Sequence, residues 1–152
     1  MTAPRSTQPL ELLITLPAVA TSAGGIRRRI RPWLTGLGWP EDELDDIVMA
    51  VDEAVANVVD HAYPPGPATG DVHVYAWIAT AAPHRRVVVS ITDRGRWRPV
   101  PQDNGNRGRG LLVMRTCMAT LHIERTSGGT AVTMTSAPIP CVEAEQAVPG
   151  RG

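Results

Sequence analysis

Apolar residues recur along this chain with two periods, one typical of helices and one typical of strands. The helical period covers residues 18–37 and then residues 40–62, where it predicts the longest helix of the chain. Pro40 opens this second helix and Pro64 with Pro65 stops it, because proline fits the first turn of a helix but not its interior. We therefore expect two consecutive helices in the first half of the chain.

Alternating apolar positions and β-branched residues predict strands over residues 10–16, 71–81 and 87–93. A helix is expected over residues 111–121, and a Gly-Gly turn at residues 128–129 predicts a last hairpin. The element order is then strand, helix, long helix, two strands, loop, helix and two strands. This order predicts an α+β fold, a two-layer sandwich in which a mixed, mainly antiparallel sheet carries its helices on one face.

The length of 152 residues suits one domain, because a domain of this size buries about 70% of the surface that its unfolded chain exposes. We expect this domain over residues 9–136, after a flexible N-terminus at residues 1–8 and before a disordered tail at residues 137–152. Residues 94–110 form a Gly-, Arg- and Pro-rich loop, and a compact domain seldom keeps such a long loop without a functional reason.

The 15 basic residues are all arginine, and they balance the 15 acidic residues. The absence of lysine excludes enzymes that depend on a P-loop lysine, a Schiff-base lysine or a kinase strand lysine. A nucleic-acid binder usually carries a large positive excess, so we expect no direct contact with nucleic acid.

No apolar run reaches the roughly 20 residues that span a bilayer, so we expect a cytoplasmic protein without a membrane segment. The apolar start resembles a signal peptide, but Glu11 and Pro17 interrupt it and a strand explains the same run. Cys117 and Cys141 lack the spacing of a zinc site or a disulfide framework, and we expect two free thiols.

The long helix carries Glu53, Asn57 and His61 at four-residue spacing in the segment VDEAVANVVDHAY, which places them on one stripe. The opposite side of the helix is a continuous apolar arc. Taken alone, such a polar stripe is typical of a solvated helix face. However, residues 41–60 contain many acids and no cation, and a face of this kind repels itself unless a cation such as a divalent metal binds.

Two further segments combine glycine with charge. Asp93 ends a β-rich run and Gly95 follows it, a pattern common in turns that would also suit a carboxylate accepting from a ligand amino group. Gly108 and Gly110 bracket Arg109 before the short helix. A Gly-rich entry to a helix offers free amides and a positive dipole to anions, although a simple connection has the same composition.

Four motifs in this order, EAVANVVDHAY, DRGR, GRGLLVM and GGTAVTM, resemble the Bergerat ATP-binding fold of the gyrase, histidine-kinase and MutL superfamily. The chain looks most like its anti-sigma-factor serine/threonine-protein kinase branch, and the resemblance covers residues 10–135. It implies ATP and Mg²⁺ as cofactors. It also implies phosphorylation of a Ser or Thr on an anti-sigma factor antagonist of the STAS type, together with sequestration of a sigma factor.

The resemblance implies a role for each matching residue. Glu53 matches the general base that acts on the incoming hydroxyl, and Asn57 matches the amide whose oxygen holds Mg²⁺. Asp93 matches the carboxylate that accepts from the adenine amino group, with Gly95 near the ring, and Thr130 supports the adenine end. The helix entry that meets the phosphates comprises Gly108, Arg109, Gly110 and Leu111.

One departure from the family pattern supports an alternative function. Trp97 stands where the adenine motif has its second glycine, and this favours a non-catalytic partner-binding module with a vestigial or weak ATP site. The arginines of residues 27–31 are the candidate surface for an acidic partner, with a solvated face as the plain alternative. We further expect a homodimer.

Overall fold

The computed structural model describes residues 8–64, 70–96 and 109–141. The predicted loose N-terminus, apart from residue 8, and the tail after residue 141 lie outside the described residues. The elements are β1 (Glu11–Pro17), α1 (Ser22–Gly36), α2 (Glu41–His61), β2 (Asp71–Ala81), β3 (His84–Asp93), α3 (Arg109–Cys117), β4 (Thr120–Thr126), β5 (Gly129–Thr135) and β6 (Ile139–Pro140).

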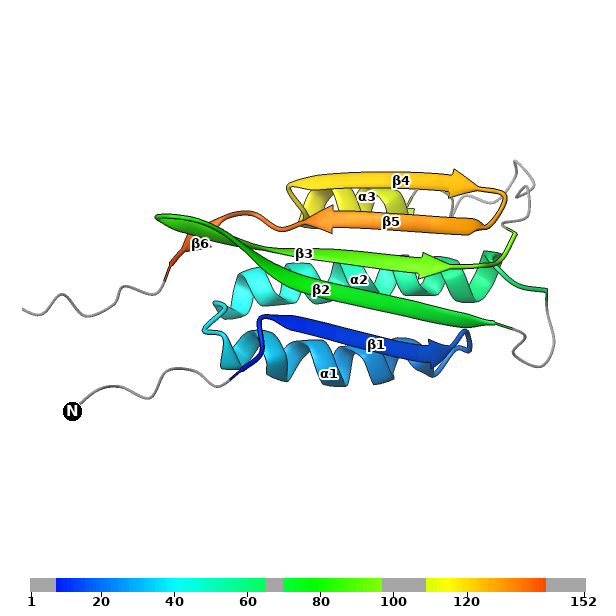
Figure 1. Cartoon of the computed structure of the whole chain (residues 1–152), viewed down its shortest axis with the longest axis horizontal. Helices are drawn as coiled ribbons and strands as arrows, with labels where there is room; N and C mark the ends of the chain where they lie inside the picture. The colour runs from blue at the N-terminus through cyan, green and yellow to red at the C-terminus, as the bar shows by residue number, and fades with distance from the viewer. Residues whose placement is uncertain (1–7, 65–69, 97–108, 142–152) are drawn as a thin grey trace, which may run out of the picture.

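The strands form one sheet in the order β1-β2-β3-β5-β4, and β6 pairs with β3 off this path. Each pairing among the described strands is antiparallel. The three helices lie on one face of this sheet (Figure 1). The predicted two-layer α+β sandwich is therefore confirmed, although no parallel pair joins the described strands to make the sheet mixed.

The core forms where the apolar stripe of α2 meets the helical face of the sheet. Every second residue of β2, β3 and β5 points to this face, as Val74, Ile91 and Val132 do, and each is at most 2% exposed. Burying one such side chain contributes about 1.5–3 kcal/mol. The fully or nearly buried residues of α2 are Leu44, Ile47, Val48, Ala50, Val51, Ala54, Val55 and Val58.

Arginines of α1 form ion pairs with acids of α2, which the sequence analysis did not foresee. Arg31 contacts Glu41 at 3.1 Å and Asp45 at 2.6 Å, and Arg27 contacts Asp52 at 3.5 Å. These pairs are largely exposed, so each is worth about 0–1 kcal/mol. The acids on the α1 side of α2 thus receive their cations from a neighbouring helix.

The end of α3 and the start of β3 differ from the prediction for the same reason. Helix α3 ends at Cys117 rather than residue 121, because the chain enters β4 at Thr120 to pair with β5. Strand β3 begins at His84 rather than residue 87, because the ladder with β2 continues to a tight turn at residues 82–83. Strand pairing therefore sets the end of α3 and the start of β3. The intrinsic propensity of the local residues does not reveal such pairing.

The prediction that residues 137–152 are disordered is wrong at its start. Ser136 is buried, and its hydroxyl accepts the Val87 N–H at 2.9 Å. The chain then pairs with β3 through β6, where Ile139 is only 4% exposed. The domain therefore extends past residue 136. None of the described helices is long and apolar enough to cross a membrane.

The β4–β5 hairpin depends on one glycine. Gly129 has φ +137°, and a β-carbon there would lie 1.9 Å from the Asp93 carbonyl oxygen. We expect Gly129→Ala to lower the free energy of unfolding by at least about 2 kcal/mol, measured by denaturant titration. Gly128→Ala is the control, because its nearest contact would be Thr126 Oγ1 at 3.7 Å. Equal stability of the two variants would contradict this close approach.

Candidate functional site

Asp93 ends β3 with its side chain on the helical face of the sheet, where it is 5% exposed. The Gly95 N–H donates to Asp93 Oδ1 at 3.0 Å, which closes a short turn after the strand. A β-carbon on Gly95 would lie 1.9 Å from the Ala62 carbonyl oxygen. The end of the strand therefore packs directly against the end of α2, and only glycine permits this approach.

Thr130 lies beside Asp93. The two residues are partners in the antiparallel register of β3 and β5, and both are 5% exposed. Side chains in such a pair project from the same face of the sheet, with β-carbons about 4.5–5.5 Å apart. The structure thus brings together two residues that the sequence analysis placed at one end of a ligand.

Glu53 and Asn57 are half-buried on the polar side of α2, where they meet the N-terminal turn of α3. A β-carbon on Gly110 would lie 3.2 Å from Glu53 Oε2 and 3.5 Å from Asn57 Nδ2. A helix start near residue 110 was predicted from sequence, but only the fold brings it against these two side chains. The polar stripe and the Gly-rich helix entry therefore form one site.

The polar groups of this candidate site include both signs of charge. The first turn of a helix carries backbone amides without partners inside the helix and the positive end of the helix dipole, and here this is the turn of α3 that begins at Arg109. Glu53 supplies a carboxylate and Asn57 an amide oxygen on the facing helix. Among the described residues, no three His, Cys, Asp or Glu side chains gather in a metal-binding group. Arg109 is exposed at the start of α3, whereas Leu111 packs partly buried against the core.

A sequence profile for the histidine kinase-like ATPase domain matches residues 16–136. The chain belongs to the histidine kinase-like ATPase family. The match spans the segments from the end of β1 through β5, and so includes both halves of the site described above.

Relatives of this ATPase domain include two bacterial proteins named serine-protein kinase RsbW. The one from Halalkalibacterium halodurans is 30% identical over 138 residues, which cover 80% of each chain. The one from Bacillus licheniformis is 28% identical over 134 residues, covering 78% of this chain and 80% of the relative. These relatives support the predicted serine/threonine kinase branch of the superfamily.

A solved structure also resembles the ATPase domain. It contains the RsbU and RsbW domains of a Mycobacterium tuberculosis protein, with a TM-score of 0.68 and 30% sequence identity. The alignment covers 86% of the present chain but 33% of the crystallised one. The aligned region is thus about a third of the crystallised chain.

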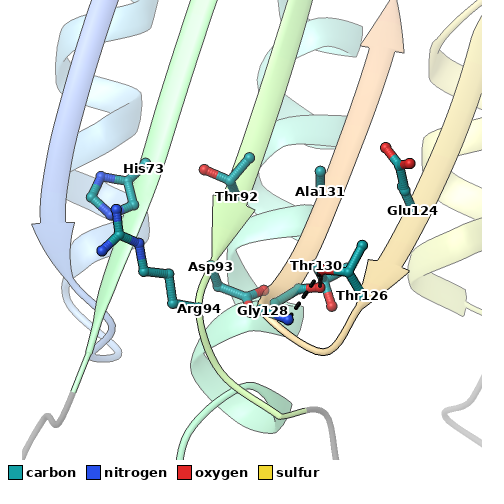
Figure 2. Close-up of a pocket in the computed structure, with 10 residues that line it drawn as sticks. His73, Thr92, Asp93, Arg94, Glu124, Thr126, Gly128, Thr130 and Ala131 are labelled. Atoms are coloured by element: carbon teal, nitrogen blue, oxygen red, sulfur yellow. Dashed lines mark hydrogen bonds between the residues drawn. The ribbon is translucent and has the colours of Figure 1, made fainter.

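The hollow drawn in Figure 2, of about 390 Å³, lies on the other face of the sheet from Glu53 and Asn57. Its walls include a cross-strand row that alternates with the buried core positions, namely His73, Thr92, Ala131 and Glu124. Asp93 and Thr130 border it only at the end of their strands. It is an open depression on the face of the sheet that the described helices leave uncovered, and it is separate from the space between α2 and α3.

Some predicted positions gain no structural account. Gly108 and Trp97 lie outside the described residues, and His61 is half-buried in the last turn of α2 without an assigned role.

One residue near the site was missed by the sequence analysis. Tyr63 follows α2 and hydrogen-bonds next to Asp93 through the Arg94 amide. An aromatic residue after a helix and before two prolines carries no signal by itself that would have revealed this contact.

Proposed function

We propose that this ATPase domain is a protein serine/threonine kinase that uses Mg-ATP to phosphorylate an anti-sigma factor antagonist and that also binds a sigma factor. The observation that supports this most is the meeting of Glu53 and Asn57 with the first turn of α3 at Gly110. Phosphoryl transfer needs charge neutralisation and positioning more than covalent chemistry, and this arrangement offers both.

The base of the nucleotide is proposed to lie against Asp93 and Thr130. A buried carboxylate at a strand end is a strong acceptor for an amino group on a planar ring, and Thr130 offers a hydroxyl beside it. Because Asp93 Oδ1 already accepts from Gly95, the carboxylate has a fixed orientation. This end of the site would therefore select for adenine.

The phosphates are proposed to lie between α2 and α3. The free amides of the first turn of α3 would bind phosphate oxygens, and the Asn57 amide oxygen would serve as a ligand to Mg²⁺. When bound, ATP supplies the phosphoryl group and Mg²⁺ neutralises charge on its oxygens. Glu53, one helical turn from Asn57, would accept the proton of an incoming hydroxyl.

The acceptor is proposed to be a Ser or Thr on a small STAS-type antagonist, because the relatives are serine-protein kinases.

The surface proposed for the sigma factor is a smaller set of arginines than residues 27–31 as a whole. Arg27 and Arg31 are engaged with acids of α2, whereas Arg28 and Arg29 are exposed and form no ion pair within the described residues. We propose that these two contact an acidic partner in the cytoplasm. The homodimer stays a prediction.

Glu53→Gln should reduce phosphoryl transfer to the antagonist at least about 100-fold, because a general base contributes roughly that much. The affinity for ATP should stay nearly unchanged, since the amide keeps the size of the side chain. Transfer is measured with labelled ATP and affinity by calorimetry. Asp60→Asn, an exposed acid on the same side of α2, is the control and should transfer normally.

Unchanged transfer in Glu53→Gln would contradict the assignment of the base. Tight ATP binding by the native protein, with no transfer to any candidate antagonist, would instead favour the non-catalytic module that Trp97 suggests.

Asn57→Ala should remove the effect of Mg²⁺ on nucleotide binding, because the variant lacks the amide oxygen proposed as metal ligand. The native protein should bind ATP more tightly with Mg²⁺ than with a chelator present, and the variant should bind equally in both. Calorimetric titrations under the two conditions measure this. A full metal response in the variant would exclude Asn57 as the ligand.

The double variant Arg28→Glu with Arg29→Glu should weaken binding to the sigma factor at least about tenfold, because like charges would then face each other. Titration with purified sigma factors measures the affinity. Arg115→Glu, an exposed arginine on α3, is the control. Equal affinities for both variants would contradict a partner surface on α1.

A further inference from the structure

The hydroxyl of Tyr63 joins two segments that are distant in sequence. It donates to the Asp71 carbonyl oxygen at 2.7 Å, at the start of β2. It accepts the Arg94 N–H at 3.1 Å, directly after β3. A hydroxyl that donates and accepts in this way fixes both partners, because each of the two hydrogen bonds polarises the other.

Packing holds the ring of Tyr63 in place. The ring is half-buried against the core, beside the start of β2. A β-carbon on Gly70 would lie 2.0 Å from Tyr63 Cε1, so the ring occupies space that only glycine leaves open. The hydroxyl therefore sits at the end of a rigid aromatic side chain and has little freedom to follow a moving partner.

The Tyr63 hydroxyl would fix the position of the Arg94 peptide. The residues on either side of Arg94 are also held by close backbone contacts. Gly95 packs against the Ala62 carbonyl, and Gly129 approaches the Asp93 carbonyl. Tyr63 supplies the third contact of this turn. The backbone from Asp93 to Gly95 is thus held by the end of α2, by the β4–β5 turn and by the Tyr63 hydroxyl.

We propose that Tyr63 is a positioning residue for base recognition. By fixing the Arg94 peptide, its hydroxyl sets the direction in which the adjacent Asp93 carboxylate points. Asp93 Oδ1 already accepts from Gly95 within the same turn, so a shift of that turn moves the carboxylate with it. This inference rests on the proposed function, in which Asp93 accepts from the amino group of adenine.

The test compares two nucleotides in Tyr63→Phe. ATP has an amino group for Asp93, whereas inosine triphosphate has a carbonyl oxygen at that position. Loss of one well-placed hydrogen bond corresponds to roughly tenfold in affinity. We therefore expect Tyr63→Phe to raise the Kd for Mg-ATP about tenfold and to leave the Kd for the inosine nucleotide within about twofold. Calorimetry measures both affinities.

Tyr75→Phe is the matched control, because it removes the hydroxyl of the second tyrosine, which lies in the middle of β2 beside Trp77 rather than at the strand-end turn. It should keep the native preference for ATP. As an independent readout, amide hydrogen exchange at Arg94 should be faster in Tyr63→Phe than in the native protein and in Tyr75→Phe. Gly70→Ala, which displaces the ring without changing Tyr63, should reproduce the loss of preference.

Equal loss of affinity for both nucleotides in Tyr63→Phe would overturn the inference, because a purely structural role lowers both. Unchanged affinities for both nucleotides would overturn it as well. A native protein that does not prefer ATP over the inosine nucleotide would overturn the proposed base recognition itself, and the inference with it. The preference of the native protein, measured first, therefore separates the two failures.

Discussion

Burial of the apolar stripe of α2 against the sheet is the constraint on which the rest of the structure depends. Because one side of the helix must face Val74, Ile91 and Val132, its polar side is turned away from the sheet. Glu53 and Asn57 consequently reach the neighbouring helix α3 rather than the core. The same packing that stabilises the domain thus orients the side chains of Glu53 and Asn57 toward α3.

The acids of α2 separate into two groups with different surroundings. On the α1 side, Asp45 and Asp52 receive arginine partners, which ties the first two helices together. On the α3 side, Glu53 faces the amides of a helix N-terminus and no arginine is placed on it within the described residues. The helix therefore forms ordinary ion pairs on one side and carries the proposed ligand site on the other.

The proposed base-binding end is built from backbone contacts rather than from long side chains. Gly95 and Gly129 allow the end of β3 to touch both α2 and β5, closer than any β-carbon would permit. Such contacts are stiff, because main-chain atoms cannot change rotamer to relieve a clash. This stiffness explains how a single carboxylate, Asp93, can be held in a defined direction at a strand end.

The sequence by itself determined the two-layer fold, the long amphipathic helix and the motifs whose order resembles an ATP-binding family. Periodicity reports which side of α2 is buried, and this depends only on residues near in sequence. The pairing of Asp93 with Thr130, the contact of Gly110 with Glu53 and the hydrogen bonds of Tyr63 were decided by tertiary structure. So was the placement of β6 in the supposed tail. Each of these joins segments far apart along the chain, and no local pattern records the register in which they meet.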